Sequence, residues 1–326
     1  MLDELKRWAN RRGYLVAWGP LELAAAVQEE VARLGKSGVL KEEFYASELG
    51  SLAETKVSQV RGLATVLMVV TPRPAHTASF DLDGRRIEAI LPPTYVRYRL
   101  LFDEVAAELR ADALRGARIE RLMAPLKPLA VRLGLVRYGR NNVTYAPGMG
   151  SYIQLLGYLT DASLPLPDGW RPQEPMLLPK CEKCRACRAV CPTGAIAADR
   201  FLLHADRCLT YINENTGPWP DFVPTGAHHC LLGCLLCQRA CPANSKLPLA
   251  STGVAFSREE TEALLADTGD HVAPVWDGVR EKLARLGQPY SEPVVGRNLR
   301  ALVEAASQGA KPRLGGEIVH TERVLG

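Results

Sequence analysis

The sequence predicts an α/β domain at the amino terminus, then a domain of the bacterial two-cluster ferredoxin type, and then a helical tail. Three observations predict this order. Helix-like and strand-like segments alternate over the first 170 residues, a proline-rich connector follows, and all nine cysteines lie between Cys181 and Cys241. We therefore place three domains at residues 1–170, 171–250 and 251–326.

The first elements are read from hydrophobic periodicity and from helix-ending residues. Residues 2–12 are helix-like, residues 14–18 form a short strand, and residues 21–34 form a second helix that ends at Gly35. Residues 65–70 are almost wholly apolar and rich in β-branched side chains. They predict a strand that is buried on both faces.

A hairpin and a long helix follow that strand. Asp83-Gly84 separates residues 77–82 from residues 85–91, and this dipeptide suits the positive φ angles of a tight turn. After Pro92-Pro93, a helical pattern runs from about residue 95 to residue 114. Helices that alternate with strands indicate a sheet covered by helices.

The second half begins with an extended connector over residues 161–179, which contains five prolines. After Leu249 we expect helical structure again. Ser257 and Glu260 form a capping-box pattern at the start of one helix, and residues 295–306 resemble another.

Composition and charge exclude several classes of protein. The chain has 326 residues, 47% hydrophobic and 23% charged, which is ordinary for a globular protein and unlike a disordered chain or a disulfide miniprotein. The apolar stretch 63–70 is too short for a membrane helix, and the amino terminus lacks the apolar core of a secretory signal. We therefore expect a cytoplasmic protein without membrane contact, in which thiols stay reduced.

The net charge of +4 is unevenly distributed. Residues 96–140 hold ten basic and five acidic side chains, a local charge of +5. This stretch could face an anionic ligand or RNA phosphates, or it could be a solvated helix face.

The cysteine spacing is the most specific signal. Cys181-x2-Cys184-x2-Cys187-x3-Cys191-Pro192 has the spacing of two-cluster ferredoxins, in which the fourth cysteine binds the neighbouring cluster. By the same crossed logic, the first 4Fe–4S cluster takes Cys181, Cys184, Cys187 and Cys241. A zinc site is the alternative, although it needs only four thiolates.

The ligands of the second cluster are less regular. Cys234, Cys237 and Cys191 fit the crossed pattern, and the fourth ligand is either Cys208 or Cys230, because Cys230 lies one position too far from Cys234. A cysteine left over would be a small buried side chain.

The motifs around these cysteines resemble the epoxyqueuosine reductase family. The resemblance rests on Tyr138-Gly139-Arg140-Asn141-Asn142, Gly150-Ser151-Tyr152, the proline-rich connector, the cysteine motifs with Pro192-Thr193-Gly194-Ala195, and the lone Cys208. It covers residues 130–245 and continues weakly through Arg297-Asn298. This family shares its architecture with respiratory reductive dehalogenases, so the resemblance implies a nitroreductase-like, cobalamin-binding amino-terminal domain.

The resemblance also implies a mechanism and its parts. Two clusters would pass single electrons to a base-off cobalamin, which drives a reductive step, and a ferredoxin or flavodoxin would supply the electrons. Cys208 would be the fourth ligand of the second cluster, as the lone cysteine is in the family. The residues expected to contact the cofactor are Tyr138, Gly139, Arg140, Asn141, Asn142 and Ser151.

The substrate side departs from the family pattern. The catalytic aspartate of the family has no counterpart here, and an ungapped count places Glu120 at its position, where it is a weak candidate for a proton donor or a surface carboxylate. Arg140 replaces a lysine, and Asn142 replaces a threonine. We therefore expect a cobalamin-dependent reductase with another substrate. The alternatives are a double-cluster electron carrier without catalysis and a true tRNA epoxyqueuosine reductase.

Overall fold

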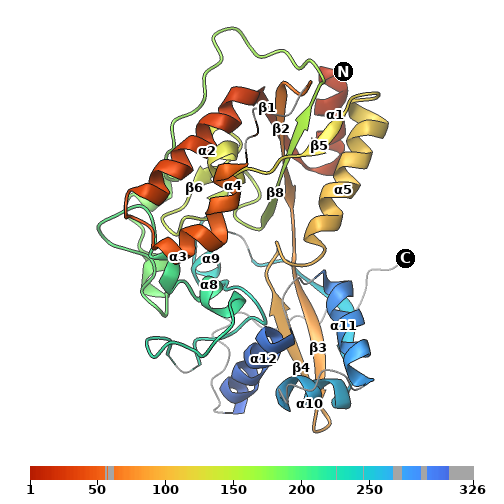
Figure 1. The fold of residues 1–326 in the computed structure, drawn as a ribbon, viewed down its shortest axis with the longest axis vertical. Helices are drawn as coiled ribbons and strands as arrows, with labels where there is room; N and C mark the ends of the chain where they lie inside the picture. The colour runs from red at the N-terminus through yellow and green to blue at the C-terminus, as the bar shows by residue number, and fades with distance from the viewer. Residues whose placement is uncertain are drawn as a thin grey trace.

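The computed structural model describes residues 1–55, 57, 62–224, 226–244, 246–266, 274–287 and 292–307. Two layered bodies are visible in Figure 1: an upper one built on the strand order β1-β2-β8-β5 and a lower one built on β4-β3-β9. Within this described part, no helix is both long and apolar enough to cross a membrane.

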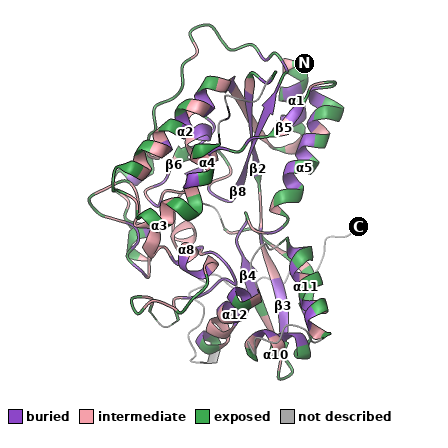
Figure 2. Cartoon of the chain, in the orientation of Figure 1, coloured by how far each residue is buried: buried purple, intermediate pink, exposed green. Residues whose placement is uncertain are grey.

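The sheet of the upper body is buried on both faces, as predicted for its central strand. Its strands are β1 (Leu15–Pro20), β2 (Thr65–Pro72), β8 (Ile153–Thr160) and β5 (Ile119–Arg121), and all neighbours pair antiparallel. Along β2, Val66 and Met68 pack into one apolar cluster, whereas Leu67 and Val69 pack into another on the opposite face. Figure 2 shows β2 and β8 as buried strands.

Helices cover both faces of this sheet. One face is covered by α1 (Leu2–Arg12) and α5 (Tyr98–Glu108), and the other by α2 (Leu21–Lys36) and α6 (Leu126–Arg132). Three short elements follow α2: α3 (Glu42–Tyr45), the π-helical η1 (Ala46–Gly50) and α4 (Ser51–Glu54). The helices predicted at residues 2–12 and 21–34 are confirmed, although the second continues through Gly35 to Lys36. The helix predicted from residue 95 starts only at Tyr98, because Arg97 takes a left-handed conformation with φ of 55°. It ends in the π-helical η3 (Leu109–Ala113).

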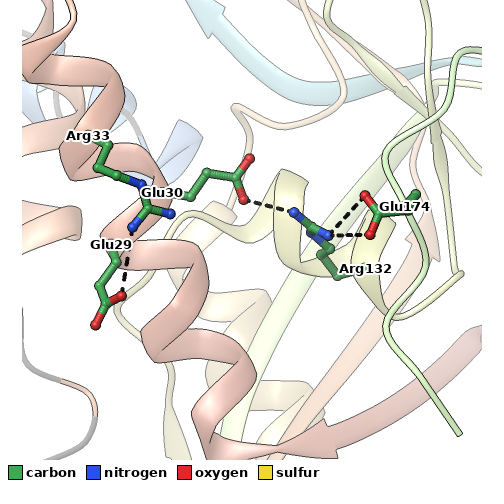
Figure 3. A network of polar contacts seen from close by, with 5 residues as sticks. All are labelled: Glu29, Glu30, Arg33, Arg132 and Glu174. Carbon is green, nitrogen blue, oxygen red and sulfur yellow. Dashed lines mark hydrogen bonds and ion pairs between the residues drawn. The ribbon is translucent and has the colours of Figure 1, made fainter.

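Arg132 links the proline-rich connector to the upper body through two ion pairs (Figure 3). Its guanidinium lies 3.1 Å from a carboxylate oxygen of Glu30 on α2 and 3.4 Å from Glu174 in the connector. Glu30 and Glu174 therefore share one half-buried cation, which holds the connector against α6 and α2.

The lower body is a three-stranded sheet made from two distant parts of the chain. It contains β3 (Ala75–Leu82), β4 (Arg85–Leu91) and β9 (Leu249–Phe256). The predicted hairpin is confirmed, with φ of 52° at Asp83 and 71° at Gly84. The helical expectation directly after Leu249 is wrong, because this segment pairs in parallel with β3, and sheet pairing overrides local preference.

Three helices cover the lower sheet: α10 (Arg258–Ala266), α11 (Val275–Leu286) and α12 (Glu292–Ser307). The predicted capping box is present, since the Ser257 backbone N–H donates to Glu260 Oε2 at 2.6 Å and the Glu260 N–H donates to Ser257 Oγ at 3.3 Å. The helical C-terminal region is therefore confirmed over these elements, and residues 267–273, 288–291 and 308–326 of the predicted tail lie outside the described residues. The domain boundaries at 170 and 250 stay predictions.

His76 on β3 is expected to contribute to the acid sensitivity of the fold, together with His228 and His229, whose pKa values burial also lowers. Burial, with a contribution from the charge of Arg73, lowers the pKa of His76 to about 4. An unfolded histidine has a pKa of about 6.5, so below this pH the unfolded chain binds the proton that the folded chain excludes. Folding stability is therefore expected to fall as the pH drops from about 6.5 toward 4.

We expect the Tm of His76→Gln to fall less between pH 7.5 and pH 5 than that of the native chain, and His204→Gln to behave like the native chain. Equal losses in all three would exclude His76 as the responsible group.

Candidate functional site

Two groups of cysteines line two neighbouring cavities. Cys181 ends the 3-10 turn η4 (Pro179–Cys181), Cys184 lies in the loop that follows it, and Cys187 is in α7 (Ala186–Ala189). Cys241 follows α9 (Leu236–Arg239). Together these four side chains line a small cavity. Their grouping brings the last cysteine of the sequence beside the first three.

The second group lines a much larger cavity of about 600 Å³. Cys191 follows α7, Cys208 lies between the 3-10 turn η5 (Ala205–Arg207) and α8 (Leu209–Glu214), and Cys234 and Cys237 come from α9 and the loop before it. The larger cavity thus opens directly onto this second set of four thiols.

Cys230 lines neither cavity. It is fully buried among Ala75, Ile90 and Leu235, and burial raises the pKa of its thiol to about 12. In this position it contributes a small apolar side chain to the packing between the cysteine segment and the lower sheet.

Burial favours the neutral thiol form of four of the cavity-lining cysteines. Burial raises the pKa of Cys187, Cys208 and Cys234, and it raises the pKa of Cys237 to about 12. Because iron binds thiolates, loading these sites must release the thiol protons.

The turn between β6 (Arg137–Tyr138) and β7 (Thr144–Tyr145) supports the first group of cysteines. Arg140 Nη2 donates to the carbonyl oxygen of Cys181 at 2.6 Å, and Asn141 Nδ2 donates to the Tyr145 hydroxyl at 3.1 Å. Gly139 is required there, since a Cβ atom would lie 2.5 Å from both Asn141 Oδ1 and the Tyr145 ring. The turn therefore fixes the backbone from which Cys181 projects.

Ser151 connects the upper body with the second group of cysteines. Its backbone N–H donates to Asn244 Oδ1 at 2.8 Å, and its hydroxyl donates to Gln238 Oε1 at 2.9 Å. The hydroxyl also accepts a bond from Asn244 Nδ2 at 2.8 Å. The Ser151 hydroxyl thus donates one hydrogen bond to protein and accepts another.

The six residues predicted to contact a cofactor are divided between three places. Asn141, Asn142 and Ser151 line the large cavity. Gly139 and Arg140 line the small one, and Tyr138 packs edge-on against Phe201 with ring centroids 5.2 Å apart. The Asn142 amide donates to the Phe201 carbonyl and accepts from the Leu203 N–H, both at 2.8 Å. The side-chain amides of Asn141 and Asn142 and the Ser151 hydroxyl therefore have protein partners, and cofactor contact by these residues stays a prediction.

Glu120 lies outside the large cavity. It is on the short edge strand β5, is 41% exposed, and accepts a bond from Arg118 Nε at 2.8 Å. Its neighbours Arg121 and Leu122 line the cavity, but Glu120 itself does not.

The lining of the large cavity is mainly apolar with two cations. Arg121 and Lys127 are its only charged side chains in the described part of the chain. The Arg121 guanidinium lies 4.1 Å from the ring centre of Phe102 and 5.2 Å from that of Tyr98, so it is stacked on aromatic faces. Desolvation lowers the pKa of Lys127. Both residues belong to the basic stretch 96–140, and no sequence pattern assigns them to a cavity.

The ten basic residues of the stretch 96–140 do not share one helix face. They are distributed over α5, η3, β5, α6 and the connecting loops, and several have partners: Arg97 pairs with Glu104, Arg118 with Glu120, and Arg132 with Glu30. The solvated-helix-face interpretation is therefore wrong, because these residues come from several elements.

A buried asparagine network supports the loop that carries Cys234. Asn213 Nδ2 donates to the Gly233 carbonyl at 2.7 Å and Asn213 Oδ1 accepts from the Gly233 N–H at 2.8 Å. Asn298 on α12 donates to the carbonyl oxygens of Asn213 and Leu231 at 2.7 and 2.8 Å. Asn213 and Asn298 are both fully buried. In this way α12 holds α8 against the cysteine loop (Figure 1).

We expect Asn213→Ala to destabilise the fold by about 2–4 kcal/mol, because it leaves two buried backbone groups of Gly233 without partners. A lower Tm and a preferential loss of iron from the second group of cysteines would be measured. Asn215→Ala is the matched control, since Asn215 is half-buried and makes one bond, to the Tyr211 carbonyl. An equal Tm loss in both variants would contradict the role of the Gly233 contact.

Comparisons with known proteins agree with this site. Residues 180–244 match the family described as a 4Fe-4S double cluster binding domain. The two-cluster domain predicted from the cysteine spacing is therefore confirmed.

Among curated proteins, the chain is 30% identical over 147 residues to the epoxyqueuosine reductase of Francisella cf. novicida, covering 43% of this chain and 39% of that protein. It is 33% identical over 118 residues to the enzyme of Bacillus subtilis, covering 36% and 28%. The alignments thus span well under half of the length of these relatives.

The fold is shared over nearly the whole chain. The structure of epoxyqueuosine reductase from Bacillus subtilis matches with a TM-score of 0.62 and 19% identity, over 98% of this chain and 86% of that one. The enzyme from Streptococcus thermophilus matches with a TM-score of 0.65 and 16% identity, over 93% and 80%. The protein is therefore a mixed α/β protein with a 4Fe–4S double-cluster domain. It is a distant relative of the epoxyqueuosine reductases, as the motifs indicated.

Proposed function

We propose that this protein is an iron–sulfur reductase that delivers electrons through two 4Fe–4S clusters to a corrinoid bound in the large cavity. One observation carries the proposal: Cys191, Cys208, Cys234 and Cys237 line the same cavity of about 600 Å³ that the upper body closes from the other side. An electron that reaches a cluster on these thiols is beside whatever the cavity holds. An electron carrier without catalysis needs no such chamber.

The two cavities support one assignment of ligands. Cluster one is held by the set Cys181, Cys184, Cys187 and Cys241, and cluster two by Cys191, Cys208, Cys234 and Cys237. The first set joins three cysteines of the first motif to Cys241, the last of the second motif, and the second set joins Cys234 and Cys237 to Cys191, the last of the first motif, and to the lone Cys208. Cys230 takes no part, because it lines neither cavity.

The cavity suits a corrinoid by the chemistry of its lining. Leu, Pro and Ile side chains form apolar walls for a flat macrocycle. Neutral amides and hydroxyls, including Gln154, Thr94 and Thr144, lie among them and could bind the amide groups at a corrin rim. A corrinoid bound there would supply the low-potential reductive chemistry, while the protein orients it beside cluster two and excludes water.

Three residues beside the cysteine sets hold the upper body against the cysteine segment. Ser151 and Asn142 bond to segments on either side of the cysteines, and Arg140 supports the loop of cluster one. These contacts hold the two cysteine sets and the cavity in fixed positions relative to one another, as electron transfer between fixed centres requires. We infer a substrate other than the one named for the relatives, because Glu120, which stands at the position of the family's catalytic carboxylate, lies outside the cavity.

The proposal is tested by anaerobic reconstitution with iron and sulfide, incubation with cob(II)alamin, and removal of free cofactor. About eight irons per chain together with one retained corrinoid would support it. About eight irons with no retained corrinoid under any condition of reconstitution would leave a double-cluster electron carrier. Restoration of queuosine in a strain that lacks epoxyqueuosine reductase would instead identify the tRNA enzyme.

A further inference from the structure

The loop that carries the cluster-one cysteines is strongly basic. Residues 180–188 contain four cations and one acid, Glu182, a local charge of +3. Lys180, Lys183 and Arg188 are all exposed. We call these three side chains the basic rim.

The cations of this loop have two different roles. Arg185 is used inside the loop, since its Nη1 donates to the carbonyl oxygens of Glu182 and Cys184, both at 3.0 Å. Within the described part of the chain, the three side chains of the basic rim form no ion pair. Their charge is therefore available to an approaching molecule.

The position of the basic rim matches the electron entry point that the two cavities define. Cys191, Cys208, Cys234 and Cys237 face the large cavity, whereas the rim residues are interleaved in sequence with Cys181, Cys184 and Cys187. A protein that reduces the clusters from outside must therefore approach at cluster one, and it meets the basic rim there. Met176, which is 51% exposed and four residues before Lys180, offers an apolar contact nearby.

Resting on the reductase function proposed above, we propose that the basic rim is the docking surface for an acidic one-electron carrier protein. One electron leaves the reduced carrier and enters cluster one, which is reduced by one electron, and no proton or bond is exchanged. Complementary charge accelerates such an encounter by about 10- to 1,000-fold at low ionic strength. An RNA would also be attracted to cations, but the rim residues alternate in sequence with the cluster-one cysteines and none of them lines the large cavity, which favours a redox partner.

The test compares two triple variants of the reconstituted protein with equal changes of charge. The first is Lys180→Glu/Lys183→Glu/Arg188→Glu. The control is Lys6→Glu/Arg7→Glu/Arg11→Glu on exposed positions of α1, which lies at the far edge of the upper body from α9 (Figure 1). A reduced plant-type ferredoxin is the acidic probe, and photoreduced 5-deazariboflavin is an uncharged reductant that needs no docking.

We expect the rim variant to be reduced by ferredoxin about 10- to 100-fold more slowly at low salt, and the difference to shrink strongly in ~1 M salt, where the screening length is about 3 Å. Reduction by deazariboflavin should be unchanged, and the α1 variant should match the native protein. Calorimetric binding of oxidised ferredoxin, which requires no electron transfer, should weaken only in the rim variant.

Reduction of the rim variant by ferredoxin at the native rate would overturn the proposal. Native ferredoxin kinetics combined with lost binding of unmodified tRNA would also overturn it and would assign the rim to RNA. If ferredoxin reduction depends on the rim but no corrinoid is retained, the docking surface holds and the reductase function fails.

Discussion

Cys208→Ala is expected to leave about four irons per chain where the native protein holds about eight. Cys208 lines the large cavity with Cys191, Cys234 and Cys237, so its loss opens cluster two and leaves cluster one intact. Anaerobic iron and sulfide analysis, together with the EPR spectrum of the reduced protein, measures the effect. The spectrum should retain the signal of a single cluster.

Cys230→Ala is the matched control, because it removes a thiol from the same region of sequence but from an apolar site. We expect it to keep about eight irons, with only a small loss of stability from the missing sulfur. If Cys230→Ala loses a cluster and Cys208→Ala does not, the ligand assignment is wrong and Cys230 is the fourth ligand.

Thr94→Trp is expected to abolish corrinoid retention while both clusters stay in place. Thr94 lines the large cavity with an exposed side chain, so an indole at this position projects into the space without displacing buried protein. At least a tenfold weaker affinity for cob(II)alamin should result, measured by absorption titration under anaerobic conditions. Iron content should equal that of the native protein.

Thr216→Trp controls for the new aromatic surface, because Thr216 is exposed and does not line the cavity. It should bind the corrinoid like the native chain. Native affinity in Thr94→Trp would show that a corrinoid, if bound, lies elsewhere.

The parts of the fold that could be predicted depend on neighbours in sequence. The Asp83-Gly84 turn and the Ser257 capping box are set by backbone angles and side chains within four residues, and both are confirmed. Strand β9 was missed because its conformation depends on β3, more than 170 residues away. The late start of α5 depends on a left-handed Arg97, which no local rule predicts for an arginine.

The candidate site, too, could be predicted only where it depends on residues that are close in sequence. Cysteine spacing was specific enough to predict a two-cluster domain, because few other sites need this number of thiolates at these intervals. The cavity was not predictable, since its wall joins Thr94, Lys127 and Cys208 from three separate segments. Sequence resemblance pointed to Asn141, Asn142 and Ser151, and the structure adds that their side chains mainly bond to protein.

The most direct test of the central claim is the EPR spectrum of reduced, reconstituted protein with bound cob(II)alamin. A corrinoid in the large cavity lies against cluster two, so the electron spins of the cobalt and of the reduced cluster should interact. We expect a cluster signal that is split or broadened by cob(II)alamin in the native protein and unaffected in Cys208→Ala. A bound cob(II)alamin whose spectrum is the sum of isolated cobalt and cluster signals would contradict it.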